Sequence, residues 1–348
     1  MIRLRTIDAH AGGDPLRLIV DGFPAPRGAT MAEKREWAAR MADHLRRVAL
    51  LEPRGHRDMQ AAVLTEPTSA GSHAGLLFLD ADGFRPMSGH GVIAVTTIVL
   101  ERALLMPGGD GSLVVFDTPA GTVRARASVA ARPAEPARSD RMRDEGAERC
   151  RVDRVAFTGV PSFVLYAGMS VKLATRAVRA DVAFGGAFYA IVDSEAAGLG
   201  VAAAYGAELR RAGRQIRTAI EAVHPIAHPL DAGLRGLTGT IFTGPPEASD
   251  AHMRSVAVVG DGHLGRSPSG TGTAAVMAVL HAMGLLDAAA PFVSEGIIGT
   301  RFMGRLAGTT AVGDCPAIVP EIEGSAWITG EHTLLADQSD PLGAGFRV

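Results

Sequence analysis

Two short turns in this chain place serine, glycine and one histidine at the start of an apolar, helix-length stretch. Residues 88–105 read SGHGVIAVTTIVLERALL, and residues 269–286, about half the chain further on, read SGTGTAAVMAVLHAMGLL. The first turn of a helix carries unpaired N–H groups and a positive dipole potential, which bind anions. We therefore expect both helix starts to face one cleft and to hold a carboxylate there. Such a cleft suits removal of a proton from the carbon next to that carboxylate.

The candidate catalytic residues in these turns are Ser88, His90 and Ser269. A serine at a helix start is often only an N-cap, which is the structural alternative. The repetition of the turn argues for more than capping. His90 lies beside the expected site, and an imidazole is suited to handling protons near neutral pH.

The second turn, RSPSGTGT, is rich in small hydrogen-bond donors. It lacks the lysine of a P-loop, no GxGxxG opens a nucleotide-binding unit, and neither serine stands in a GxSxG elbow. We expect the backbone N–H groups of Gly89, His90, Gly270, Thr271 and Gly272 to bind the substrate carboxylate. Gly91 is a further candidate substrate-binding residue.

Two further candidates lie outside these turns. His10 belongs to the segment IDAHAGGD, where Asp8 and Asp14 accompany it, and these side chains either orient groups at the site or stabilise a turn. Asp261 in VVGDGHLG is a turn former first. Both His10 and Asp261 are kept as candidate substrate-binding residues.

The remaining pattern predicts an α+β protein with two pseudo-symmetric lobes, each wrapping strands around one central helix. Amphipathic helices are expected at residues 30–50, where Thr30 and Glu33 suit a capping box, and at residues 194–223. DVAFGGAFYAIVD reads as one strand, and residues 128–149 as an exposed loop. We expect residues 1–155 plus 332–348 to form the first lobe and residues 156–331 the second, with the site in the cleft between them.

Composition excludes several classes of function. Hydrophobic residues make up 47% of the 348 residues and the formal net charge is −2, so a nucleic-acid partner is not expected. No apolar run reaches the ~18–20 residues that span a bilayer. The start, MIRLRTIDAHAGG, resembles a first strand more than a signal peptide, so a cytoplasmic protein is expected. Cys150 and Cys315 lack metal-ligand spacing, and no metal site is expected.

Taken together, the motifs resemble those of the proline racemase family, which includes hydroxyproline 2-epimerases and trans-3-hydroxyproline dehydratases. The resemblance runs nearly end to end and rests on DAHAGGDPLRLIVDG, EPRGHRDMQAAVL, MSGHG, VPSFV, FGGAFYAIV, GRSPSGTGTAA, IIGTRFMGRL and WITGEHTLLADQSDP. It implies the diaminopimelate-epimerase-like fold and a substrate flanked by one residue at the head of each helix. It also implies that no metal or organic cofactor is needed, and we expect a homodimer.

The chain departs from the family pattern at three positions. Ser88 and Ser269 stand where the racemases typically have cysteine, and Gly265 stands where an aspartate usually contacts the substrate ammonium. A thiol, with a pKa of about 8.5, can become a thiolate at a helix start. A helix dipole contributes at most ~2 kcal/mol, which cannot make a serine hydroxyl a resting base.

These departures leave several activities open. The resemblance implies proton abstraction at Cα of a proline-like imino acid, as in a hydroxyproline 2-epimerase or a proline racemase. The alternatives are a trans-3-hydroxy-L-proline dehydratase and a weakly active homologue that binds an amino or imino acid. A further alternative is that Ser88 and Ser269 were engineered in place of cysteines. Elimination tolerates an asymmetric Ser/Ser site better than two-base racemisation does, because elimination needs only one base and one acid.

Overall fold

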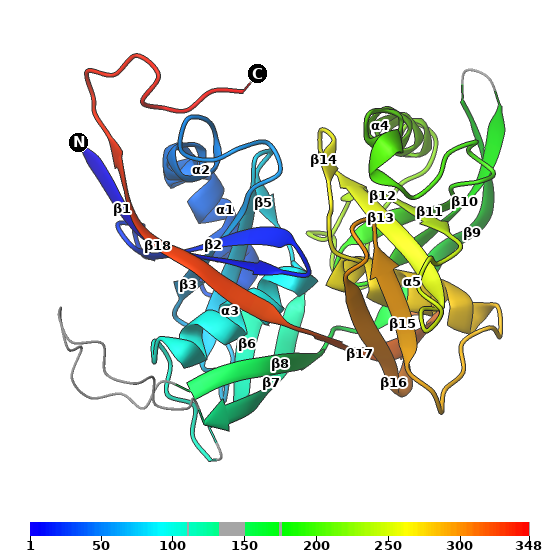
Figure 1. The fold of residues 1–348 in the computed structure, drawn as a ribbon, viewed down its shortest axis with the longest axis horizontal. Coiled ribbons are helices and arrows are strands. Elements are labelled where there is room, and N and C mark those ends of the chain that lie inside the picture. Colours follow the sequence, from blue (N-terminus) through cyan, green and yellow to red (C-terminus); the bar gives the residue numbers. More distant parts are fainter. Residues whose placement is uncertain (110, 132–149, 174–175, 348) are drawn as a thin grey trace.

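The computed structural model describes residues 1–348 except 110, 132–149, 174–175 and 348, and forms two lobes side by side (Figure 1). The predicted α+β architecture is confirmed. Each lobe wraps a curved sheet around one buried helix, which is α3 (Gly89–Glu101) in the first lobe and α5 (Gly270–Ala282) in the second. Residues 89–100 are buried throughout, so α3 has no solvent face, as its all-apolar sequence requires.

The sheet of the first lobe follows one continuous pairing order, in which β2 pairs with β3 and β4 pairs with β6 in parallel and the other neighbours are antiparallel. Its strands, in spatial order, are β18 (Ala326–Ala336), β1 (Ile2–Ala11), β2 (Asp14–Asp21), β3 (Gln60–Thr65), β4 (Ala74–Asp80), β6 (Leu113–Thr118), β7 (Gly121–Ala131) and β8 (Cys150–Thr158). The short β5 (Phe84–Arg85) pairs with β4 just before α3.

The second lobe repeats this order strand for strand. Its parallel pairs, β11 with β12 and β13 with β15, occupy the same places. The strands are β9 (Ser162–Lys172), β10 (Ala177–Phe184), β11 (Phe188–Asp193), β12 (Gly239–Gly244), β13 (Met253–Val259), β15 (Phe292–Gly296), β16 (Arg301–Val312) and β17 (Cys315–Gly324). Here β17 also pairs with β9, which closes the sheet around α5. The short β14 (His263–Leu264) pairs with β13 just before α5, as β5 does with β4 before α3.

Strands also join the lobes. The end of β17 pairs with β8, and β18 then returns to the first lobe beside β1, which places both termini there (Figure 1). The predicted lobe boundaries, 155/156 and 331/332, both fall inside single strands, β8 and β18. The proposed division of the chain therefore stays a prediction.

The outer helices differ from the two predicted ones. In place of one helix over 30–50 there are α1 (Met31–Met41) and α2 (Asp43–Leu50), separated at Ala42, whose φ of −129° and ψ of 12° leave the helix. The break lets each helix turn its own apolar residues to the core. The capping box of Thr30 and Glu33 is confirmed.

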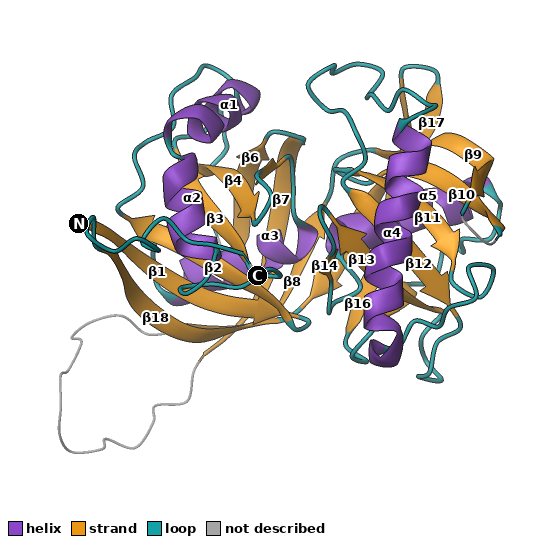
Figure 2. Ribbon diagram, turned by 90° about the horizontal axis from the view of Figure 1, so that it is seen from above, coloured by secondary structure: helices purple, strands orange, loops and turns teal. Residues whose placement is uncertain are grey.

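The second outer helix is shorter than predicted. A 3₁₀ turn (Ala203–Tyr205) precedes α4 (Gly206–Glu221), which lies on the outer face of the second lobe (Figure 2). Gly198, with φ of 71°, holds the preceding segment in a turn that a helix cannot include. The buried residues of α4 recur at helical spacing along one face: Leu209, Gly213, Ile216 and Ile220.

Two other predictions fail locally. The Gly185–Gly186 pair does not lie within a strand but turns the chain between β10 and β11, because Gly186 has φ of 97°. Residues 128–131 belong to β7 and are not part of a loop, since they pair with β8. The remainder of the predicted loop, 132–149, lies outside the described residues.

Candidate active site

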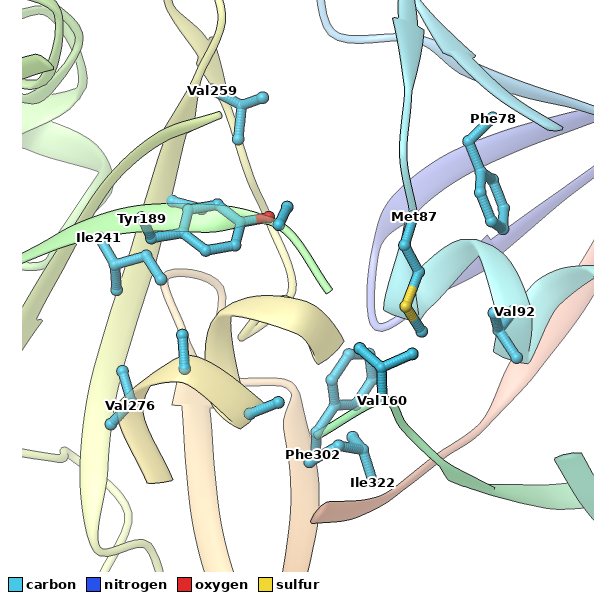
Figure 3. Close-up of a cluster of buried hydrophobic side chains, with 14 of the residues drawn as sticks. Phe78, Met87, Val92, Val160, Tyr189, Ile241, Val259, Val276, Phe302 and Ile322 are labelled. Carbon is cyan, nitrogen blue, oxygen red and sulfur yellow. The ribbon is translucent and has the colours of Figure 1, made fainter. Parts of the chain in front are cut away.

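The starts of α3 and α5 meet head to head between the lobes. A Cβ added at Gly89 would lie 2.5 Å from Cα of Gly270, and one added at Gly270 would lie 2.8 Å from Cα of Gly89. Only glycine allows this approach. Apolar side chains from both lobes pack around the junction, among them Phe78, Met87, Ile241 and Val276 (Figure 3).

A small cavity of about 30 Å³ opens at this junction. It brings Ser88, His90, Ser269 and Thr271 together, as the sequence predicts for one shared cleft. Further lining residues come from both lobes: Asp14, Gln60, Arg85, Met87, Tyr189, Thr238, Ala257, Val259, His263 and Gly265.

Ser88 caps α3 and links two neighbouring side chains. Its Oγ accepts the N–H of Gly91 at 3.3 Å and donates to Oε1 of Gln60 at 3.1 Å, and it lies 3.4 Å from Nδ1 of His90. Because the Ser88 hydroxyl donates to Gln60, its oxygen can accept a hydrogen bond from the His90 ring. In this arrangement His90 does not remove the proton of Ser88.

His90 is buried at the same helix start. Burial lowers the pKa of His90 below the ordinary 6.5; the Asp14 carboxylate opposes this shift and the His263 ring adds to it. The imidazole is consequently neutral at pH 7 and able to accept a proton. Its Nε2 is buried and has no hydrogen-bond partner among the described residues.

Ser269 caps α5 from a constrained backbone. Its φ of 64° is left-handed, an unusual state for a serine that is found preferentially at functional sites. Its Oγ accepts the N–H of Gly272 at 3.2 Å, and its own N–H donates to Oγ of Ser267 at 3.1 Å. Beside it, Thr271 and Tyr189 share a hydroxyl hydrogen bond of 2.8 Å.

The turn before Ser269 is held by Asp14, which reaches across from the first lobe. Its carboxylate accepts the N–H groups of Arg266 at 2.8 Å and Ser267 at 3.0 Å, and also the Ser267 hydroxyl. Of the two roles that the sequence leaves open for Asp14, the structure supports orientation of the site. Asp8 instead forms a buried ion pair with Arg17.

Two predicted substrate-binding residues do not line the cavity. Asp261 is exposed at a turn and pairs with Arg214 at 3.2 Å. His10 stacks on Trp327 and accepts the N–H of Gly13 at 3.3 Å. Both assignments are therefore corrected: Asp261 is a turn former whose carboxylate faces solvent, and His10 packs against β18.

Some backbone N–H groups at the starts of α3 and α5 are already hydrogen-bonded, and others are not. The N–H groups of Gly91 and Gly272 are taken by the capping serines. Gly89, His90, Gly270 and Thr271 occupy the first helical positions, where N–H groups have no acceptor within the helix. These four positions remain the candidates for carboxylate binding.

Comparison with known proteins places this site in a family. The family profile described as "Proline racemase" matches residues 6–347. The chain belongs to the proline racemase family. Its relatives include isomerases of the racemase and epimerase type, and other relatives are dehydratases.

Named relatives of this family member cover both kinds of activity. The chain is 38% identical to the trans-3-hydroxy-L-proline dehydratase of Bacillus cereus and 40% identical to the 4-hydroxyproline 2-epimerase of Streptosporangium roseum, in each case over 98% of this chain and 97% of the relative. It is 34% identical to the proline racemase of Clostridioides difficile, over 99% and 97%.

Solved structures agree on the fold. A hydroxyproline epimerase from Agrobacterium vitis with bound trans-4-OH-L-proline matches with a TM-score of 0.87 and 30% identity, over 100% of this chain and 95% of that one. A phenazine biosynthesis protein of the PhzF family from Bacillus anthracis matches with a TM-score of 0.56 at 11% identity, over 96% and 100%. The predicted diaminopimelate-epimerase-like fold is confirmed.

This proline racemase family member offers no free carboxylate for a substrate ammonium among the described lining residues. Asp14 is saturated by donors, and Gly265 lies at the wall where the family pattern has aspartate. A Cβ added at Gly265 would lie 3.4 Å from the Ala257 oxygen, which is ordinary contact. The site therefore has room for a side chain that its sequence does not supply.

A larger cavity of about 350 Å³ adjoins the first and shares Arg85 and Thr238 with it. It lies between the lobes, where Arg35 donates to the Gly233 carbonyl at 3.3 Å. Its walls include Phe84, Phe184, Phe188 and Leu234. The two cavities are therefore neighbours.

Sequence analysis missed five polar residues at the cavity: Gln60, Arg85, Tyr189, Thr238 and His263. None belongs to a repeated motif. Arg85 and His263 lie in the short strands β5 and β14, which precede the two helices. No local sequence signal distinguishes these residues. Among the described residues, no group of His, Cys, Asp and Glu is arranged to hold a metal, and no helix is long and apolar enough to cross a membrane.

Proposed function

We propose that this enzyme abstracts the Cα proton of a proline-like imino acid and returns a proton to the opposite face, as a hydroxyproline 2-epimerase does. The observation that carries this proposal is the shared cavity of Ser88, His90, Ser269 and Thr271 at two helix starts related by pseudo-symmetry. Relatives named 4-hydroxyproline 2-epimerase and proline racemase support it.

In this proposal each part of the site has a role. The N–H groups of Gly89, His90, Gly270 and Thr271 bind the carboxylate and stabilise the negative charge that spreads into it when the Cα proton leaves. Ser88 and His90 act on one side of Cα, and Ser269 lies on the other. No metal or organic cofactor is required in this scheme.

Dehydration of trans-3-hydroxy-L-proline is the second candidate, because the two sides of the site are unequal. In the first turn an imidazole lies 3.4 Å from the serine oxygen, whereas the neighbours of Ser269 are the hydroxyls of Ser267, Thr271 and Tyr189. An elimination removes the Cα proton, breaks the C3–O bond and releases water, so it needs one base and one proton donor. The trans-3-hydroxy-L-proline dehydratase of Bacillus cereus supports this reading.

Incubation in D₂O separates the candidates. For an epimerase, trans-4-hydroxy-L-proline should gain deuterium at Cα and convert to cis-4-hydroxy-D-proline. For a dehydratase, trans-3-hydroxy-L-proline should lose water and yield the cyclic imine. Proton NMR follows all of these products. Binding of these compounds without exchange or turnover would overturn both candidates and identify a binding homologue.

We further propose a cytoplasmic homodimer and the lobe division 1–155 plus 332–348 and 156–331. The sequence pattern and the family resemblance support these statements. Light scattering of the purified protein should give twice the mass of the chain, and a monomer would contradict the proposed assembly.

A further inference from the structure

The serines at the two helix starts differ in one backbone angle. Ser88 has φ of −141° and ψ of 115°, an ordinary extended conformation for a residue that caps a helix. Ser269 has nearly the same ψ, 119°, but its φ of 64° is left-handed. A serine keeps a left-handed φ only where the surrounding structure holds it there. The contacts that hold Ser269 therefore bear on its function.

The hydroxyl of Ser267, two residues earlier, holds the Ser269 backbone. Its Oγ accepts the N–H of Ser269 at 3.1 Å, a local bond that serine side chains make in turns. The Ser267 hydroxyl donates its own proton to Oδ2 of Asp14. With the proton directed to Asp14, the Ser267 oxygen presents a lone pair to the N–H of Ser269. Ser267 is completely buried, so water does not compete for either bond.

Asp14 reaches this turn from the other lobe, where it begins β2. Besides the hydroxyl, its carboxylate accepts the N–H groups of Arg266 at 2.8 Å and of Ser267 at 3.0 Å. Asp14 is only 2% exposed, and hydrogen bonds to a charged acceptor are stronger than neutral ones. Because the acceptor and its donors belong to different lobes, these bonds exist only while the lobes are together.

The neighbouring Gly12 brings the lobes into direct contact at the same place. Its φ is 58°, and a Cβ added there would lie 2.9 Å from Cβ of Ser267, which only glycine avoids. Its carbonyl accepts the hydroxyl of Thr300 at 2.7 Å. The turn between β1 and β2 therefore rests directly on the turn that precedes Ser269.

We propose that Asp14 is a positioning residue for Ser269, which is held in its working conformation only while the lobes are closed. This inference rests on the proposed function, in which Ser88 and Ser269 lie on opposite sides of the substrate Cα. When the lobes separate, Asp14 leaves the turn and releases the Ser267 hydroxyl. Ser269 can then return to an extended φ like that of Ser88.

The two sides of the site consequently differ in when they are assembled. Ser88 has an ordinary backbone, and its partners Gln60, His90 and Gly91 all belong to its own lobe. The first side is therefore formed whether the lobes are open or closed. The second side is completed by closure around the substrate, so proton transfer at Ser269 takes place after water has been excluded.

Deuterium exchange from separate epimers tests the positioning role. Wild-type protein in D₂O should exchange the Cα proton of both trans-4-hydroxy-L-proline and cis-4-hydroxy-D-proline. Asp14→Asn replaces one accepting oxygen by a donor, so exchange from the epimer whose Cα proton faces Ser269 should fall by about tenfold or more. Exchange from the other epimer, whose proton faces Ser88, should stay at the wild-type rate. A purely structural role of Asp14 would affect both epimers equally.

A second variant and a control complete this test. Ser267→Ala removes the link between Asp14 and Ser269 and should cause the same loss for the same epimer, also if Asp14→Asn folds poorly by thermal melting. Asp21→Asn, the same change at an exposed aspartate of β2, should leave both rates unaltered. Wild-type rates, or equal losses for both epimers, in the Asp14 and Ser267 variants would overturn the positioning role alone. Exchange by the wild type from one epimer or neither would overturn the proposed function, on which the role rests.

Amide hydrogen exchange tests the link to closure. The planar analogue pyrrole-2-carboxylate should slow exchange at Ser267 and Ser269 in the wild type, because closure returns these N–H groups to Asp14 and to the Ser267 hydroxyl. In Ser267→Ala the slowing at Ser269 should be lost, whereas slowing at Gly270 and Thr271 reports that the analogue is bound. Equal slowing at Ser269 in both proteins would overturn the proposed hold on its backbone.

Discussion

At the scale of single residues, a chain of hydrogen bonds decides which atom at the site is basic. Oε1 of Gln60 accepts a hydrogen bond from the Ser88 hydroxyl, and the Ser88 oxygen in turn lies 3.4 Å from Nδ1 of His90. Gln60 is thus a positioning residue, since it acts on the substrate through Ser88 and His90.

Gln60→Met should lower kcat for Cα exchange by about 10²-fold with little change in KM, because the tautomer that exposes His90 Nε2 loses its support. Gln60→Glu keeps an acceptor for the Ser88 hydroxyl and should retain most of the activity. Steady-state rates in D₂O give both parameters. Unchanged kcat in the methionine variant would contradict this role.

The same residues predict a pH dependence. Burial lowers the pKa of both His90 and His263 below 6.5, so both rings are neutral at pH 7. Protonation then removes the base as pH falls, and kcat/KM for exchange should decrease on the acid side of pH 6.5. Among the charged neighbours, Asp14, Asp58 and Asp80 raise these pKa values and Arg266 lowers the pKa of His263 further. A pH–rate profile whose activity already falls above pH 6.5 as the pH is lowered would contradict buried imidazoles with a lowered pKa as bases.

Gly265 provides a third prediction at this scale. Gly265→Asp should lower KM for an imino acid by about tenfold, because a charge-assisted hydrogen bond to the ammonium contributes ~1.5–3 kcal/mol. Gly265→Asn has nearly the same shape without the charge and is the matched control. Equal effects of the two substitutions would show that the added side chain does not act through charge.

The site was only partly predictable at the residue scale. Ser88, His90 and Ser269 stand in a repeated turn, so their common cavity could be expected from the sequence. Gln60 and His263 stand in the quoted segments EPRGHRDMQAAVL and VVGDGHLG, but nothing in these segments marks them as site residues. They reach the cavity through the pairing of β3 with β2 and of β14 with β13. Asp261 shows the converse error, since a carboxylate close in sequence to the second turn points to Arg214.

At the scale of elements, the head-to-head contact of α3 and α5 fixes the width of the site. The sequence predicted both helices and their serine caps because an all-apolar stretch behind Ser-Gly-x-Gly is a strong local signal. It did not predict the break at Ala42, because the residues around it have no helix-breaking glycine or proline. Tertiary packing decides that break, as α1 and α2 bury different faces.

Gly270→Ala tests the contact between the helix starts. The added methyl would lie 2.8 Å from Cα of Gly89 and 3.2 Å from the ring of Phe157. Overpacking of this kind costs about 1–3 kcal/mol of stability, and the displaced helix starts should also reduce exchange activity by more than tenfold. Gly308→Ala, where an added Cβ meets nothing within 4 Å, is the matched control. Thermal melting and exchange rates measure both effects, and equal behaviour of the two variants would contradict the argument.

At the scale of the whole molecule, polar contacts across the lobes hold the site closed. Asp58 of the first lobe pairs with Arg210 and Arg266 of the second, and Asp14 holds the turn at Ser267. The cavity of about 30 Å³ holds about two water molecules, since one needs ~10–15 Å³. A proline-sized substrate must therefore reach the site while the lobes are further apart, and these contacts re-form around it.

Arg210→Met should weaken binding by shifting the population away from this closed arrangement. Arg210 and Asp58 are 25% and 8% exposed, so their ion pair is screened less than a surface pair, and its loss should raise the Kd of a planar analogue such as pyrrole-2-carboxylate by about tenfold or more. Calorimetric titration gives the Kd, and amide hydrogen exchange should become faster at His263–Leu264. Arg211→Met, a change at an exposed neighbour on α4, should alter neither quantity. If both variants bound the analogue as tightly as the wild type, the contacts between the lobes would not contribute to ligand capture, and closure would have to be driven by the ligand itself.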